Sequence, residues 1–176
     1  MIRATCTKKR REEVLAHRNG RDAYTRRSAR GLLGDDGNVD HVLECQVLRY
    51  ATEGVFGESG AHQGVARSFS AAANDVSNLN LTSRRVNQSK KGPFTAALNR
   101  LEKGATKVDL ESLARGGRAS WLVDEGAWAN VEREIVESYD ALEERLEKER
   151  ATRAHAKVLA RATDAVRETL EKMGLV

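Results

Sequence analysis

Apolar residues recur every three or four positions through much of this chain, which is the period of an amphipathic helix. The stripe is longest in the C-terminal part, where it comprises Trp128, Val131, Ile135, Tyr139, Leu142 and Leu146, and then Val158, Ala162, Val166, Leu170 and Met173. A polar interval near residues 149–153 separates its two parts. The pattern predicts two long helices packed over the preceding half of the chain. The alternatives are one helix of about 45 residues, about 70 Å long, and pairing of these helices between two chains.

Shorter helical patterns precede this stripe, separated by glycine-containing and polar segments. They predict helices over residues 8–18, 43–52, 65–75, 83–86, 94–103 and 109–114. Pro93 is expected to open the helix over 94–103, because proline suits the first turn of a helix. The glycine-rich stretch from Gly54 to Gly64 is expected to be a loop.

Two segments show features of short strands. The turn-forming residues 34–38 lead into residues 39–42, and residues 76–82 alternate Val76, Asn78 and Asn80 with Leu79 and Leu81. The expected fold class is therefore α+β, mostly helical. Three regions are expected: a basic N-terminal helical segment over residues 1–33, a small core with two strands over 34–104, and a C-terminal helical extension over 105–176.

Charge is distributed unevenly along the 176 residues. The chain carries a net charge of +4, with +7 in residues 1–100 and −3 in residues 101–176. A basic first half suits a polyanionic partner such as nucleic acid. The tetrapeptide Lys8-Lys9-Arg10-Arg11 fits a nuclear import signal, an arm that contacts phosphate, or an exposed helix start.

Composition excludes several classes of protein. The longest apolar runs fall short of the roughly 18 residues of a membrane span, and the start of the chain has no apolar signal-peptide region. The two cysteines, Cys6 and Cys45, are too few and too far apart for a disulfide framework or a four-cysteine zinc site. We therefore expect an intracellular protein, with the nucleus as one location.

The residues with the clearest chemistry are an Asp-His pair, two asparagines spaced nine residues apart, and a following lysine, namely Asp40-His41, Asn78, Asn87 and Lys90. Hydrolysis of a phosphodiester needs an activated water and neutralisation of charge on the phosphate. A histidine can accept the proton of the water near neutral pH. Carboxylate and amide oxygens, here Asp40 and Asn87, are ligands that suit Mg²⁺.

Basic residues flank the second asparagine and complete this set. Lys90 is expected to hold or neutralise the phosphate, and Arg84, Arg85 and Lys91 to bind the nucleic acid. Mn²⁺ could substitute for Mg²⁺. Glu44 and Gln46 could join the site, Asn80 competes with Asn78 for its role, and His62 lies in the glycine-rich stretch; their roles stay open.

Residues 36–92 resemble the HNH signature of the ββα-metal, or His-Me finger, endonucleases. The resemblance implies that His41 is the general base, that Asn78 braces the loop, and that Asp40 and Asn87 bind the metal. It also implies a ββα-metal core, here with a helix and a loop inserted in the 37 residues that separate His41 from Asn78. The string from Asp40 to Gln46, with the basic residues 8–11, is also similar to HNH-like domains of fungal and oomycete proteins, including nucleus-directed effectors.

The sequence thus predicts a metal-dependent, HNH-like endonuclease that cleaves DNA, or RNA, with low sequence specificity. Aromatic residues make up only 5% of the chain, and no recognition helix stands out, so binding would rest on phosphate contacts. The alternative is a non-catalytic module that binds nucleic acid or protein, keeps an HNH-like scaffold and assembles through its helices.

Overall fold

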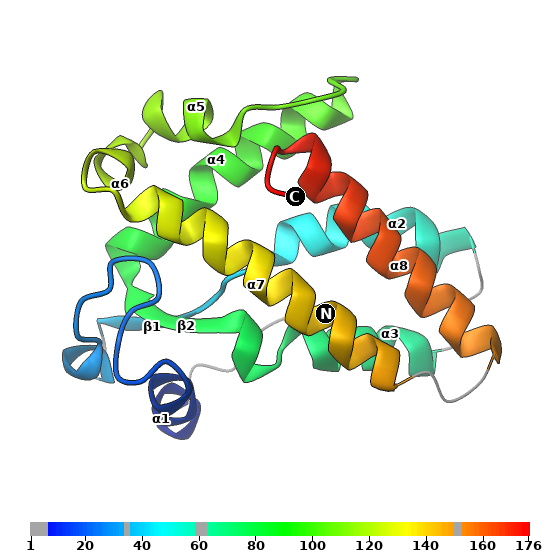
Figure 1. The fold of residues 1–176 in the computed structure, drawn as a ribbon, viewed down its shortest axis with the longest axis horizontal. Helices are drawn as coiled ribbons and strands as arrows, with labels where there is room; N and C mark the ends of the chain where they lie inside the picture. The colour runs from blue at the N-terminus through cyan, green and yellow to red at the C-terminus, as the bar shows by residue number, and fades with distance from the viewer. Residues whose placement is uncertain (1–6, 34–35, 59–62, 150–152) are drawn as a thin grey trace.

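The computed structural model describes residues 7–33, 36–58, 63–149 and 153–176. Within them the chain is mostly helical and contains one small antiparallel sheet (Figure 1). This arrangement confirms the expected α+β fold class. Its elements are α1 (Lys8–His17), η1 (Arg30–Leu33), β1 (Gly37–His41), α2 (Cys45–Glu58), α3 (Gln63–Ala73), η2 (Val76–Asn78), β2 (Leu79–Ser83), α4 (Arg84–Glu102), α5 (Leu110–Arg115), α6 (Ser120–Asp124), α7 (Ala127–Lys148) and α8 (Arg153–Lys172), where η denotes a 3₁₀-helix.

Helices α7 and α8 carry the long apolar stripe and bury it inside one chain. They are separate elements that pack on one another, and α8 also packs on α2 while α7 packs on α3 (Figure 1). The predicted break near residue 150 is confirmed. Trp128, Ile135 and Val166 lie in the core, and within the described residues Val176 is the only large apolar side chain that is strongly exposed. In the described residues, these helices therefore direct their apolar stripes into the core of the same chain.

Three expectations about local structure were wrong. Residues 76–78, expected to belong to the second strand, form the 3₁₀-helix η2, and β2 begins at Leu79. Residues 54–58 belong to α2, because Val55 and Phe56 pack against the core and extend the helix past Gly54. Pro93 lies inside α4 instead of opening a new helix. Proline interrupts the hydrogen bonds of a helix, but buried Pro93 and Phe94 pack in the interior, and this packing maintains one continuous helix.

Strands β1 and β2 pair in antiparallel orientation, although helices α2 and α3 lie between them in sequence. Asp40 pairs with Asn80, and His41 pairs with Leu79. The first strand starts at a glycine because a Cβ on Gly37 would lie 1.7 Å from the carbonyl oxygen of Leu32. The second strand runs directly into α4, so the order strand, strand, helix that the HNH resemblance implies is present.

The two faces of this sheet differ in character, because neighbouring residues of a strand point to opposite sides. One face, which we call the α1 face, packs Leu79 and Leu81 against Val14 of α1. The other, the α4 face, carries Asp40 and Asn80, whose side chains contact Lys90 of α4 and the segment of residues 22–24.

The basic N-terminal segment is joined to the rest of the molecule by ion pairs to one buried carboxylate. Arg18 and Arg26 each lie 2.7 Å from a carboxylate oxygen of Glu134, which is buried in α7. Arg18 also donates hydrogen bonds to the carbonyl oxygens of Ser77 and Leu79, at the start of the second strand. One guanidinium therefore connects the N-terminal segment, the sheet and α7.

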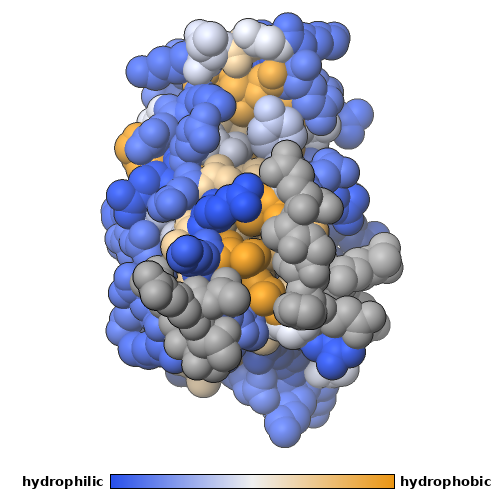
Figure 2. Space-filling view, turned by 90° about the vertical axis from the view of Figure 1, so that its right-hand side faces the viewer, coloured by the Kyte–Doolittle hydropathy of each residue, from blue (hydrophilic) through white to orange (hydrophobic). Residues whose placement is uncertain are grey.

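The surface is largely hydrophilic on the side that Figure 2 shows, with apolar side chains gathered in a hollow near its centre. Among the described helices, none is both long and apolar enough to cross a membrane.

Candidate functional site

The turn after β1 is held by the Asn78 side chain. Its Oδ1 accepts a hydrogen bond from the backbone N–H of Leu43 at 2.7 Å, and its Nδ2 donates to the carbonyl oxygen of Ala73 at 2.8 Å. The backbone N–H of Val42 donates to the carbonyl oxygen of Asn78. Asn78, the last residue of η2, thus links the end of α3 to the turn that follows His41.

His41 lies at the end of β1, and its imidazole is oriented by Asn74 at the end of α3. His41 Nε2 is 2.9 Å from Asn74 Oδ1. Asn74 Nδ2 donates to the carbonyl oxygen of Ser70, so its Oδ1 must face the imidazole as an acceptor. Nε2 therefore carries the proton of the neutral ring, and Nδ1 carries the lone pair that a general base needs.

The environment favours the neutral form of His41. Burial lowers the pKa of His41 below 6.5, although the hydrogen bond to Asn74 and the charge of Asp40 act in the opposite direction. The charges of Lys90 and Arg10 lower this pKa further. The ring is consequently neutral at pH 7, but it is only 8% exposed.

This lowered pKa makes stability depend on pH. Above pH 6.5 the imidazole is neutral in both folded and unfolded chains, whereas below it the unfolded chain binds a proton that the folded chain does not. The free energy of unfolding therefore decreases as the pH falls below 6.5, by up to about 1.4 kcal/mol per pH unit from His41 alone.

Urea unfolding between pH 7.5 and about 5 should show a shallower decline of this free energy for His41→Gln than for wild type. His17→Gln, at an exposed position, should keep the wild-type slope, and equal slopes for all three proteins would contradict the assignment.

Asp40 does not share a site with the His41 ring, because the two side chains lie on opposite faces of the sheet. Asp40 is buried on the α4 face, where its Oδ2 accepts a hydrogen bond from the Tyr24 hydroxyl at 2.7 Å and lies 2.9 Å from Lys90 Nζ. For Asp40 to act as a metal ligand beside the His41 base, as expected, one of the two side chains would have to move to the other face of the sheet. The strand stays regular through His41, so no bulge re-aims either side chain.

Lys90 lies at the centre of the α4 face and has no exposed surface. Its ammonium donates hydrogen bonds to the carbonyl oxygens of His41 and Val42, at 2.7 and 3.1 Å, and forms ion pairs with Asp40 Oδ2 and Glu44 Oε1, both at 2.9 Å. The sequence interpretation placed this lysine on a phosphate. The ammonium is instead enclosed by oxygens of its own chain, and a phosphate could reach it only if this enclosure opened.

Opposing effects determine the charges in this cluster. Burial by itself lowers the pKa of Lys90, but the carboxylates of Asp40 and Glu44 outweigh it and raise that pKa above 10.5. Burial raises the pKa of Glu44, and the positive charge of Lys90 opposes this effect. Burial and the neighbouring Asp40 raise the pKa of Tyr24 well above 10.0. Lys90 is therefore charged, and the Tyr24 hydroxyl is a stable proton donor to Asp40.

The residues expected to bind Mg²⁺ do not fit the ion as they are arranged. Asp40 Oδ2 is already paired with Lys90. Asn87 is half-buried one turn earlier on α4, and its side chain forms no hydrogen bond with the described residues. The described part of the chain contains no group of three or more His, Cys, Asp or Glu side chains that could hold a metal. Asp40 Oδ2 therefore already has both a cation and a hydrogen-bond donor as partners.

The expected nucleic-acid contacts lie on the surface of α4. Arg84, Arg85 and Lys91 are exposed, and the Arg85 guanidinium stacks 4.2 Å from the centre of the Trp121 ring. Asn80, the competitor of Asn78, is buried on the α4 face and bonds to Asp22 and to the backbone of Ala23.

Two further residues with open roles have different positions. Gln46 donates to the carbonyl oxygen of Lys91 and accepts from the Thr95 hydroxyl, so it links α2 to α4. His62 lies outside the described residues.

Three residues next to the site were not among the predicted site residues. Tyr24 reaches Asp40, Asn74 orients His41, and Arg10 donates to the backbone carbonyl of Asn74. They lie 16, 33 and 64 positions from the groups that they contact. The basic run at residues 8–11 gave one partial indication, since an arm that contacts phosphate was among its interpretations.

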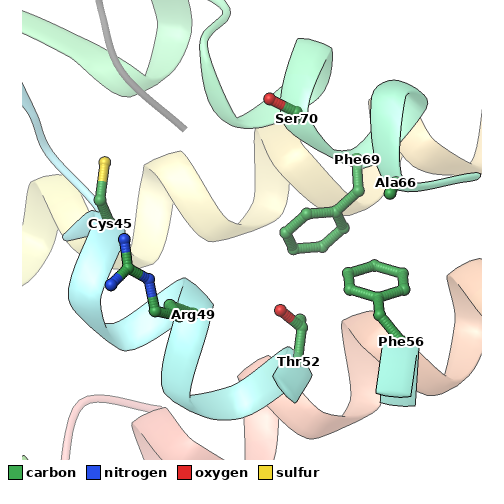
Figure 3. A pocket seen from close by; sticks show the side chains of 7 residues that line it. All are labelled: Cys45, Arg49, Thr52, Phe56, Ala66, Phe69 and Ser70. Carbon is green, nitrogen blue, oxygen red and sulfur yellow. The ribbon is translucent and has the colours of Figure 1, made fainter. Parts of the chain in front are cut away.

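A pocket of about 190 Å³ opens between α2 and α3 close to Asn74 (Figure 3). Phe56 and Phe69 lie at one end of it, with their rings in edge-to-face contact, and Cys45 and Arg49 lie at the other. Burial raises the pKa of the Cys45 thiol to about 12. The thiol is therefore protonated at neutral pH and a poor nucleophile.

In comparisons with known proteins, no family model, no curated protein and no solved structure matches the chain.

Proposed function

We propose that this protein is an HNH-like endonuclease that hydrolyses phosphodiester bonds of DNA, or of RNA, with His41 as the general base. The observation that carries the proposal is the orientation of His41. His41 Nε2 donates its proton to Asn74 Oδ1, so Nδ1 is the nitrogen that can accept a proton. His41 lies at the end of β1, and Asn78 holds the turn that follows. The strand, strand, helix order supports the same function.

In the proposed reaction, His41 Nδ1 removes a proton from a water molecule while the water oxygen forms a bond to phosphorus. The bond from phosphorus to the departing sugar oxygen breaks, and that oxygen takes a proton from solvent. General base catalysis of this kind contributes about 10²–10⁴-fold to a rate. Arg10, whose charge acts on His41 and whose guanidinium donates to the carbonyl oxygen of Asn74, is the cation that we assign to the negative phosphate.

Low sequence specificity follows from the kind of contacts that the surface offers. Exposed Lys8, Lys9, Arg84 and Lys91 can pair with phosphates, and such contacts carry no base information. Binding should weaken steeply with salt, because each neutralised phosphate releases condensed counterions.

A non-catalytic nucleic-acid-binding module is the second candidate, and the arrangement around Asp40 favours it. Asp40 and the His41 ring lie on opposite faces of the sheet, and Lys90 neutralises the carboxylate that would otherwise bind a metal. Such a module would hold DNA without cutting it.

Nicking of supercoiled plasmid separates the two candidates. Wild type, His41→Ala and His17→Ala are incubated with plasmid in EDTA, Mg²⁺ or Mn²⁺, and a parallel set uses single-stranded RNA. The nuclease proposal predicts nicking by wild type and His17→Ala that falls by about 10²–10⁴-fold in His41→Ala. All three proteins should retard the plasmid equally on a gel.

Two outcomes would count against the nuclease. Plasmid that is retarded but never cut under any condition supports the binding module. Equal nicking by His41→Ala removes His41 from the reaction.

A further inference from the structure

The ammonium of Lys90 has the surroundings of a bound metal ion. Two carboxylate oxygens and two backbone carbonyl oxygens lie within 2.7–3.1 Å of it. An ammonium has only three protons to donate, so four oxygens exceed its hydrogen-bonding capacity. Glu44 Oε1 accordingly has no aligned hydrogen-bond donor although it is buried.

These four oxygens are the ligand types of a hard divalent cation. Ca²⁺ binds carboxylates and backbone carbonyls at about 2.3–2.6 Å, in flexible geometry. The distances here are those of N–H···O contacts. Two carboxylates around one lysine also leave an excess of negative charge when both are ionised, which a divalent cation would neutralise completely.

The lysine stem prevents such an ion from entering. Lys90 Nζ lies 5.1 Å from the centre of the Tyr24 ring and 5.9 Å from that of Phe94, and the side chain has no exposed surface. An entering ion would have to displace an ammonium that has no route to solvent. The aromatic walls also favour a cation of low charge density, through their π faces.

We infer that Lys90 is the resident cation of this site: its ammonium replaces a divalent metal among Asp40, Glu44 and the carbonyls of His41 and Val42, and removing it creates a divalent-cation site. The folded wild-type protein then takes no metal at Asp40. This inference does not depend on the nuclease proposal, because its readout is the binding of a cation.

Binding of Mn²⁺, followed by electron paramagnetic resonance, tests the inference. The proteins are wild type, Lys90→Ala, Lys90→Ala/Glu44→Gln and, as the matched control, Lys91→Ala at the exposed neighbouring position. We expect one saturable Mn²⁺ per chain in Lys90→Ala and no saturable site in the other three. Ca²⁺ should compete for the site and raise the melting temperature of Lys90→Ala alone.

Two results would overturn the inference. One is stoichiometric Mn²⁺ binding by wild type, and the other is a folded Lys90→Ala that binds no cation. If Lys90→Ala does not fold alone, it is refolded in about 5 mM Ca²⁺, above the roughly 10⁻³ M of weak protein sites. Recovery of helical circular dichroism then supports the inference, and failure to recover it overturns it.

Discussion

Replacing Lys90 by Met should lower the free energy of unfolding by about 3–5 kcal/mol, the range for removal of one partner from a buried ion pair. Methionine fills a similar volume, so the loss comes from charge and not from packing. The substitution leaves Asp40 and Glu44 buried without their cation, and the carbonyl oxygens of His41 and Val42 without a donor. Whole domains have a free energy of unfolding of only about 5–15 kcal/mol, so this loss is a large fraction of the total stability. Urea unfolding at pH 7, followed by circular dichroism, measures it.

The neighbouring lysine provides the control. Lys91→Met changes an exposed residue on the same turn of α4 and should alter stability by no more than about 0.5 kcal/mol. Adding Asp40→Asn and Glu44→Gln to Lys90→Met removes the stranded charges and should restore at least about 1 kcal/mol. A Lys90→Met protein as stable as Lys91→Met would show that the cluster contributes nothing to the fold.

Replacing Asn78 by Ala should cost about 2–3 kcal/mol, since it leaves the backbone N–H of Leu43 and the carbonyl oxygen of Ala73 buried without partners. The turn after β1 would then lose its connection to the end of α3. Asn74 and His41 lie on the two sides of that connection, so their hydrogen bond should also weaken. Urea unfolding gives the loss of stability.

Asn99→Ala, at an exposed position of α4, is the matched control and should stay within about 0.5 kcal/mol of wild type. If the nuclease proposal holds, nicking should fall in Asn78→Ala but not in Asn99→Ala. Equal stability of the two variants would mean that the Asn78 side chain does not hold the turn.

Elements defined by long, regular patterns could be predicted from the sequence. The stripe from Trp128 to Met173 predicted both C-terminal helices and the break between them, because burial of one face enforces the helical period. The strand that ends at His41 and the strand followed by α4 were also recovered. The prediction that Pro93 opens a helix was wrong, because the burial of Pro93 and its neighbour Phe94 keeps α4 continuous through this position.

The surroundings of the site could not be predicted from local sequence. Lys90, within Ser89-Lys90-Lys91, has the sequence context of a solvated helix face. Its burial becomes apparent only when the fold brings Asp40 and Glu44 beneath it, because a buried charge needs partners that local sequence does not specify. Asn74 is a similar case, since its only sequence context is the end of an alanine-rich helix.

The ion pairs of Glu134 with Arg18 and Arg26 have a consequence for folding during synthesis on the ribosome. During synthesis the ribosome adds 116 residues between Arg18 and Glu134, which takes about 6–23 s at 5–20 residues per second. Throughout this interval the nascent chain carries its basic N-terminal segment without the counter-charge that later holds it. The ion pairs of Arg18 and Arg26 with Glu134 can form only after this part of α7 has left the ribosome, so the N-terminal segment is joined to α7 late in synthesis.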